Sequence, residues 1–143
     1  MRRSLARPAG FTLIEILVVV FIIGLLATIV SVNVTGQTDN ARNTKAKVDL
    51  KEIEQGLHLY KLDNGIYPTT DQGIAALVQK PTGGPQPRKY NPEGYIQKIP
   101  EDPWGNAYVY LSDGQSFVLR CLGADGEQGG EGKNADIDSR DLG

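Results

Sequence analysis

The chain has 143 residues, 40% of them hydrophobic, with 17 acidic and 15 basic side chains and a net charge of −2 at pH 7. An acidic chain is a poor nucleic-acid binder, because phosphate contacts require Lys and Arg. Its single cysteine, Cys121, excludes an intrachain disulfide, and no phosphate loop, metal triad or hydrolase motif occurs. We therefore expect one small domain that is not an enzyme.

The N-terminal segment is apolar and follows a short basic leader. Residues 1–10 contain only three charges, Arg2, Arg3 and Arg7. After Gly10 comes FTLIE (residues 11–15), and residues 16–38 carry no charge at all. The run from Phe11 to about Val30 is long enough to cross a bilayer as a helix. The leader arginines predict that the N-terminus stays in the cytoplasm.

One acidic residue, Glu15, interrupts this apolar segment. An ionised carboxylate inside a membrane helix costs at least a few kcal/mol on insertion scales, so it usually has a partner. The simplest partner is a cation from another copy of the same chain. The pattern therefore predicts a subunit of an assembly that is stored in the membrane.

The helix is expected to continue beyond the membrane segment. Apolar residues recur there at spacings of four and three, which places them on one face: Ala46, Leu50, Ile53, Leu57 and Tyr60. The Asn64-Gly65 pair predicts a left-handed stop after Asp63. Residues 31–37 are rich in β-branched side chains and include Gly36, so local melting of the helix there is left open.

The second half predicts a small mixed domain. Thr69 and Gln72 fit a capping box that would start a short helix at 70–79, followed by a Pro/Gly loop at residues 80–88. Two short strands within 107–121 flank a turn and predict a β-hairpin. The expected fold class is α+β, with a long N-terminal helix and a short antiparallel sheet.

The C-terminal tail, residues 122–143, is the second candidate site. Four aspartates separated by glycines offer hard oxygen ligands: Asp125, Asp136, Asp138 and Asp141. Such a loop suits Ca²⁺ better than Mg²⁺, because Ca²⁺ accepts about six to eight oxygens in flexible geometry. Zinc would require Cys or His, of which the chain has one each. The residue pattern alone leaves a solvated acidic surface equally open.

Together, these segments resemble a known family. Gly10, Phe11 and Glu15 hold the positions of the class III signal of the type IV pilin superfamily. The segments YKLDNGIYPTTDQG (60–73), GYIQKIPEDPWGNAYVY (94–110) and LGADGEQGG (122–130) resemble the major pseudopilins of bacterial type II secretion systems. The resemblance implies a type IV pilin-like fold.

The resemblance also implies processing and topology. A prepilin peptidase would cut between Gly10 and Phe11 on the cytoplasmic side, and Phe11 would then be N-methylated. The chain would cross the inner membrane once and place its C-terminal domain in the periplasm. The implied parts are a removed leader (1–10), a transmembrane and assembly helix (11–35) and a periplasmic domain (36–143) made of a helix continuation (36–63), a short helix (70–79), a hairpin (107–121) and a Ca²⁺ loop (122–143).

The implied function is structural. The chain would be the main building block of a helical fibre that grows from the inner membrane into the periplasm and helps export folded proteins across the outer membrane. Its implied partners are other copies of itself, a prepilin peptidase, minor pseudopilins and an inner-membrane assembly platform. Within the superfamily, a type IV pilin or a competence pseudopilin is the alternative. Outside it, the alternative is a membrane-anchored Ca²⁺-binding module.

The family's metal site and helix break can be carried over by position. Implied Ca²⁺ ligands are the Leu122 backbone carbonyl and the side chains of Asp125 and Asp136. The side chain of Asp138 and the Gln128 carbonyl are second choices. Many family members carry a proline where this chain has Val32, so the melting of the helix that the family implies is left open here.

Overall fold

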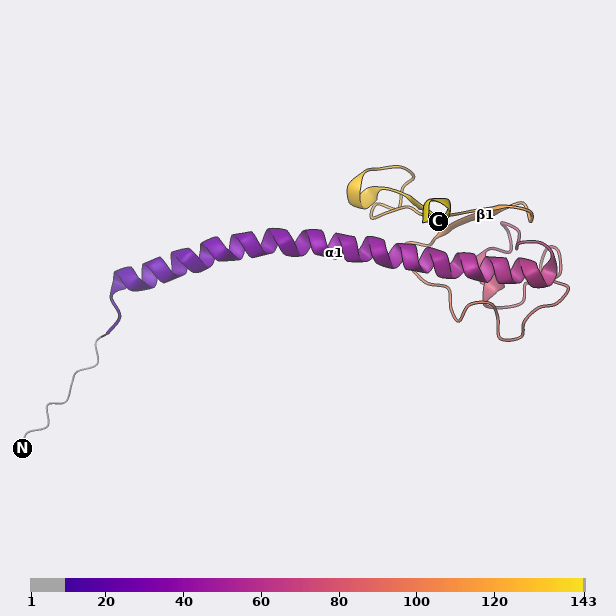
Figure 1. Ribbon diagram of the computed structural model, residues 1–143, viewed down its shortest axis with the longest axis horizontal. Coiled ribbons are helices and arrows are strands. Elements are labelled where there is room, and N and C mark those ends of the chain that lie inside the picture. Colours follow the sequence, from indigo (N-terminus) through magenta and orange to yellow (C-terminus); the bar gives the residue numbers. More distant parts are fainter. Residues whose placement is uncertain (1–9, 143) are drawn as a thin grey trace, which may run out of the picture. The chain divides into compact units, whose positions relative to one another are not determined.

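A computed structural model describes residues 10–142, except for the side chains of residues 30–35. The chain divides into two compact units, one ending at Thr38 and the other beginning at Asp39. Both contain part of one long helix, α1 (Leu13–Asn64), drawn in indigo to magenta in Figure 1. We describe each unit by itself.

The first unit is the N-terminal part of α1, whose large apolar side chains are exposed. Phe11 is 84% exposed, Leu13 80% and Phe21 73%. No helical stretch within the described residues combines the length and apolar character that a bilayer crossing requires. The crossing expected at 11–35 includes residues 30–35, whose side chains lie outside this description. The backbone of 31–37 is helical, so the melting left open above is not seen.

In the second unit, α1 buries the face that the sequence predicts. Ala46, Leu50, Ile53 and Leu57 are fully buried, and Tyr60 is 1% exposed. The helix ends at Asn64, one residue after the predicted end. Gly65 follows with a φ of 83°, and its amide donates to the Lys61 carbonyl at 2.7 Å. This left-handed residue is the predicted glycine stop.

The short helix predicted at 70–79 is present, but it is shorter than expected. The capping box itself is present, because the Thr69 amide donates to Gln72 Oε1 at 3.1 Å and the Gln72 amide to Thr69 Oγ1 at 3.4 Å. It is followed only by a short 3₁₀ helix, η1 (Ile74–Leu77). Gly73 has a φ of 61°, which interrupts the helical path, and the Leu77 carbonyl accepts from the Tyr95 amide at 2.6 Å.

The sheet has three antiparallel strands in the order β1-β2-β3. β1 (Val109–Ser112) and β2 (Phe117–Cys121) form the predicted hairpin. β3 (Ile137–Asp138) pairs with β2 from within the tail and was not predicted. Two 3₁₀ turns flank β3, namely η2 (Gly132–Asn134) and η3 (Ser139–Leu142).

The core of this unit lies between α1 and the sheet. Leu119 and Cys121 are fully buried with the apolar face of α1, and Leu77 and Ile96 belong to the same cluster. A hydrogen bond joins the two layers, because the Tyr108 hydroxyl donates to Asp49 Oδ2 at 2.8 Å. The tail that carries the predicted ligands is therefore anchored on a packed β2 strand.

Candidate functional site

The N-terminal candidate site lies where α1 begins. Residues 10–12 precede the helix without regular structure, and Gly10 and Phe11 are exposed. Apart from its chain neighbours, no described residue has an atom within 4 Å of the position that a Cβ on Gly10 would occupy. The bond predicted to be cut therefore lies in an open, non-helical segment that a peptidase can reach.

Glu15 forms a capping box with Thr12 at this helix start. The Thr12 amide donates to Glu15 Oε2 at 2.9 Å, and the Glu15 amide donates to Thr12 Oγ1 at 3.3 Å. The Thr12 hydroxyl also donates to Oε2, at 3.1 Å. The T-x-x-E pattern that produces this box is visible in the sequence, but we did not predict it. Among the described residues, Oε1 of Glu15 has no hydrogen bond.

The C-terminal candidate site is a closed loop after β2. The Ala124 amide donates to the Lys133 carbonyl at 3.0 Å, which closes residues 124–133 on themselves. A Cβ on Gly123 would lie 2.6 Å from the Asn134 carbonyl, so only glycine fits there. Asp125 is exposed, and its Oδ1 accepts from the Glu127 amide at 3.1 Å.

Asp136 has a buried oxygen that lacks a partner. Its Oδ1 is inaccessible and has no hydrogen bond among the described residues. Its charge also contributes to raising the pKa of the nearby Cys121 thiol to about 11, a shift that comes mainly from burial. A buried carboxylate oxygen without a donor is costly, so such an atom calls for a partner.

Asp138 has its partners within the protein. Arg120 Nε donates to its Oδ2 at 2.8 Å, Arg140 NH2 to the same oxygen at 2.7 Å, and Arg140 Nε to Oδ1 at 2.9 Å. These bonds, chiefly those from Arg140, hold the pKa of Asp138 well below its usual value. Both oxygens are therefore already neutralised by arginine.

The structure does not gather the predicted ligands into a metal cage. Within residues 10–142, no three His, Cys, Asp or Glu side chains are placed so that they could hold a metal ion. Leu122 is partly buried at the end of β2, and Gln128 is exposed in the loop. Calcium binding remains a prediction.

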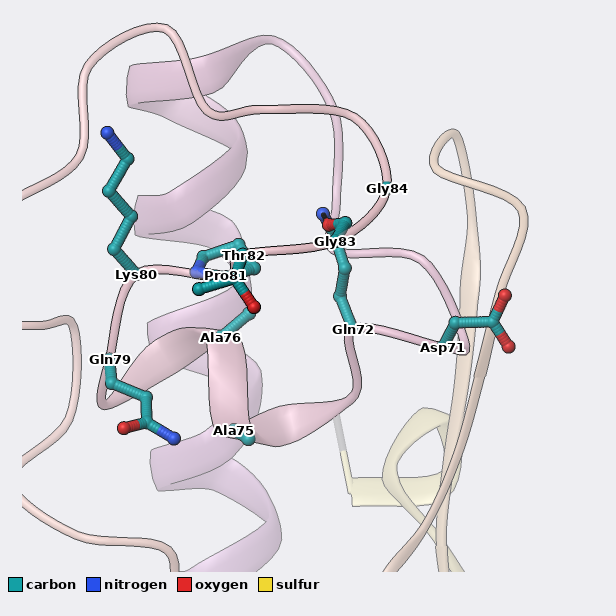
Figure 2. A pocket seen from close by; sticks show the side chains of 10 residues that line it. All are labelled: Asp71, Gln72, Ala75, Ala76, Gln79, Lys80, Pro81, Thr82, Gly83 and Gly84. Carbon is teal, nitrogen blue, oxygen red and sulfur yellow. Dashed lines mark hydrogen bonds between the residues drawn. The ribbon is translucent and has the colours of Figure 1, made fainter.

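The remaining polar groups have structural surroundings. The His58 ring shares a hydrogen bond of 3.0 Å with the Tyr67 hydroxyl. An open pocket of about 360 Å³ lies between η1 and the Pro/Gly loop. Figure 2 shows Gln72 reaching this loop, where its amide donates to the carbonyls of Gly83 and Pro85 at 2.8 Å each. Alanine, proline and glycine form half of the pocket lining.

Comparison with known proteins gives a consistent result. The family described as type II secretion system protein G matches residues 33–140, and the prokaryotic N-terminal methylation motif matches residues 5–31. The type II secretion system core protein G of Pseudomonas aeruginosa is 53% identical over 137 residues, covering 94% of this chain and 96% of that protein. Its counterpart from Vibrio cholerae is 50% identical over 137 residues, covering 94% and 93%.

A solved structure agrees with the sequence relatives. The crystal structure of the major pseudopilin from the type 2 secretion system of enterohaemorrhagic Escherichia coli matches with a TM-score of 0.67 and 43% identity. The match covers 76% of this chain and 90% of that one. The predicted pilin-like α+β fold is thereby confirmed, and the chain belongs to the type II secretion system protein G family.

Proposed function

We propose that this chain is the major structural subunit of a type II secretion pseudopilus, a fibre that polymerises from the inner membrane and drives export of folded proteins. The observation that carries the proposal is the exposed apolar surface of α1 between Leu13 and Ile29, in a chain whose second unit has its own core. Side chains such as Phe21, 73% exposed, are stable only when lipid or other protein covers them. Membership in the protein G family favours a pseudopilin over a pilin or an isolated Ca²⁺ module.

The proposed life cycle begins with processing. A prepilin peptidase cuts the exposed bond between Gly10 and Phe11, and the new N-terminus is methylated. The match to the prokaryotic methylation motif supports this step. Before assembly, residues 11–35 lie in the inner membrane as a single helix, with the N-terminus in the cytoplasm and the domain in the periplasm. The leader arginines and the apolar run support this orientation.

Assembly then pairs the new amine with Glu15. Four residues separate Phe11 from Glu15, a helical rise of about 6 Å. A neighbouring copy displaced by that amount brings its Phe11 ammonium next to the carboxylate. Oε1 of Glu15 is available for this contact while Oε2 remains in the capping box with Thr12. The amine exists at this position only after cleavage, so processing and polymerisation are coupled. Minor pseudopilins and an inner-membrane platform are the further partners we propose.

The C-terminal loop is proposed to hold Ca²⁺. The unpartnered buried oxygen of Asp136 fits a cation ligand. Asp125 lies in the loop that the hydrogen bond from Ala124 to Lys133 closes, and Leu122 directly precedes this loop. The Gln128 carbonyl is a further candidate. We leave Asp138 out of the set because two arginines already occupy its oxygens. A bound Ca²⁺ would link the tail to the end of β2, because its proposed ligands come from both segments.

Complementation tests the proposed function. In a bacterium whose own protein G gene is deleted, expression of this chain should restore secretion of a type II substrate into the medium. Overproduction should yield surface fibres that contain the chain. The protein G of Pseudomonas aeruginosa, tested in a strain lacking it, is the positive control. A chain that is cleaved and retained in the membrane, but restores neither secretion nor fibres, would contradict the proposal.

A further inference from the structure

The loop between Gln72 and Pro92 is basic, although Asp71 and Glu93 flank it in the sequence. Between Gln72 and Pro92 the sequence has three basic residues and no acidic one, although the whole chain has two more acidic than basic side chains. These residues are Lys80, Arg88 and Lys89. Lys80 and Arg88 are exposed, and neither forms an ion pair with any described residue. In Figure 2 the Lys80 side chain extends away from Gln72 and Asp71.

This basic loop lies at the C-terminal end of α1. The Lys89 amide donates to Oδ1 of Asn64, the last helical residue, at 3.0 Å. Lys80 and Arg88 line an open pocket of about 480 Å³, together with Tyr90 and Pro92. The Tyr90 hydroxyl is buried and has no partner among the described residues. Two free cations at the edge of a proline-lined pocket favour an acidic side chain as the ligand.

The acidic surface lies at the other end of the same unit. Glu127 and Glu131 are exposed in the closed loop after β2, and neither side chain is paired with a described residue. The tail that carries them lies against the beginning of this unit's helix, because Gly132 and Lys47 line the same pocket. Figure 1 shows the two regions apart, the tail in yellow and the basic loop in pink near the end of α1.

The two surfaces are too far apart to meet within one copy. Lys47 and Asn64 are 17 positions apart on α1, a helical rise of about 25 Å. Two different, complementary patches on opposite ends of one protein form a heterologous contact. A contact of this kind builds an open filament when its rotation does not close a ring. Charge complementarity thus identifies the partner as a second copy of this chain.

We propose that the basic loop of each copy receives the acidic loop of a neighbouring copy along the fibre. Lys80 and Arg88 pair with Glu127 and Glu131, and the pocket beside Tyr90 accepts one of the two glutamates. The inference rests on the homopolymer proposed above. The contact fixes the polarity and axial register of neighbouring domains, and because its charges are exposed, it weakens as salt screens them.

Charge reversal in the full chain tests the contact. Lys80→Glu with Arg88→Glu should reduce fibre yield at least tenfold, and Glu127→Lys with Glu131→Lys should do the same. The chain that carries all four changes should recover most of the yield, because the pair is restored with inverted sign. Lys51→Glu, an exposed cation elsewhere on α1, is the matched control and should assemble normally. Cleaved and membrane-inserted product in each variant confirms that folding and processing are intact.

Disulfide crosslinking tests the proximity directly. A chain with both Arg88→Cys and Glu127→Cys should give a ladder of multimers from oxidised fibres, whereas each single variant should give none. The native Cys121 does not interfere, since it is fully buried and its pKa is raised to about 11. The wild-type chain is expressed in the same cells and must form fibres there. If it does, loss of fibres in a variant reports on this contact and not on the ability of the chain to form a homopolymer. Normal assembly by both charge-reversed chains would overturn the inference. The inference would also be overturned if the charge-reversed chains lost fibres, the fourfold variant did not recover them and no crosslinked multimers appeared. The basic loop would then bind another anionic partner.

Discussion

Asp138 accepts a hydrogen bond from Arg120 Nε at 2.8 Å, directly across the β2–β3 pairing. Arg140 binds both oxygens of the same carboxylate. The carboxylate is nearly buried, at 8% residue exposure, so the two arginines compensate a charge that would otherwise be unfavourable. This arrangement fixes the end of the tail to the sheet and holds the last part of the acidic loop in place.

The first prediction concerns acid stability. The pKa of Asp138 is lower in the folded state than its ordinary value of 3.8, so the group stabilises the fold at pH above that value. The stabilisation is lost as pH falls below about 4, when the unfolded chain takes up the proton more readily. Asp138→Asn should lower the free energy of unfolding at pH 7 and flatten its decline below pH 4. Denaturant unfolding at several pH values measures both. Asp71→Asn, which changes an exposed aspartate, is the control. If the stability of the wild type and of both variants depended on acid pH to the same extent, Asp138 would not stabilise the fold in this way.

The second prediction concerns a close contact of α1. A Cβ on Gly56 would lie 2.7 Å from Cγ2 of Ile96 and 3.2 Å from Cδ1 of Leu77. Alanine normally favours a helix over glycine by about 1 kcal/mol. Here overpacking opposes that gain, so Gly56→Ala should destabilise the domain by about 1–3 kcal/mol. Gln55→Ala, the exposed neighbour, should change stability by less than about 0.5 kcal/mol. Chemical denaturation that shows a more stable Gly56→Ala protein would contradict this, because Ile96 and Leu77 would then move aside at no cost.

Much of the fold follows from local sequence patterns. The 4-and-3 spacing from Ala46 to Tyr60 identifies the buried helix face, and Asn64-Gly65 identifies its end. The hairpin follows from two short apolar runs around a turn. These elements could be predicted because residues near one another in sequence determine them.

Several of the errors arise where distant residues decide the structure. The capping box at Thr69 was predicted correctly, but its helix is short because Gly73 interrupts the helical path and the distant Tyr95 amide takes the Leu77 carbonyl. β3 has only two residues and therefore no detectable period. Asp138 looked like a free ligand although two arginines bind it, Arg120 from 18 residues away and Arg140 from only two, and the nearer one was overlooked. The box between Thr12 and Glu15 is local and could have been predicted, but a charge in an apolar segment directed attention to partners in other copies.

The third prediction concerns Ca²⁺. A fragment that begins near residue 36 retains the whole core and should melt several degrees higher in Ca²⁺ than in EGTA, with Mg²⁺ a poor substitute. A hundredfold excess of ligand over Kd stabilises by about 2.7 kcal/mol. Asp136→Ala and Asp125→Ala should remove this difference, whereas Asp71→Ala should keep it. Melting curves that coincide with and without Ca²⁺ would leave the tail as a solvated acidic surface.

The fourth prediction concerns processing. Coexpression with a prepilin peptidase should shorten the chain by the ten residues of its leader and leave a methylated Phe11 at the N-terminus. A large residue in place of Gly10 should block the cut, whereas Gly10→Ala should be tolerated more readily. Intact-mass spectrometry of assembled fibres measures both the cleavage and the methyl group. Fibres built from uncut chains would contradict the proposed order of events.

The most direct test of the central claim is the fibre yield of three variants at the N-terminal site. Glu15→Gln keeps an acceptor for Thr12 but removes the charge, and Glu15→Ala removes both. Thr12→Ala removes the Thr12 hydroxyl from the box but keeps the charge. Loss of one partner of a buried ion pair costs about 3–5 kcal/mol. Both Glu15 variants should therefore be cleaved and inserted yet form no fibres, while Thr12→Ala should assemble. Normal fibres from Glu15→Gln would contradict the claim that the carboxylate pairs with the Phe11 amine of a neighbouring copy.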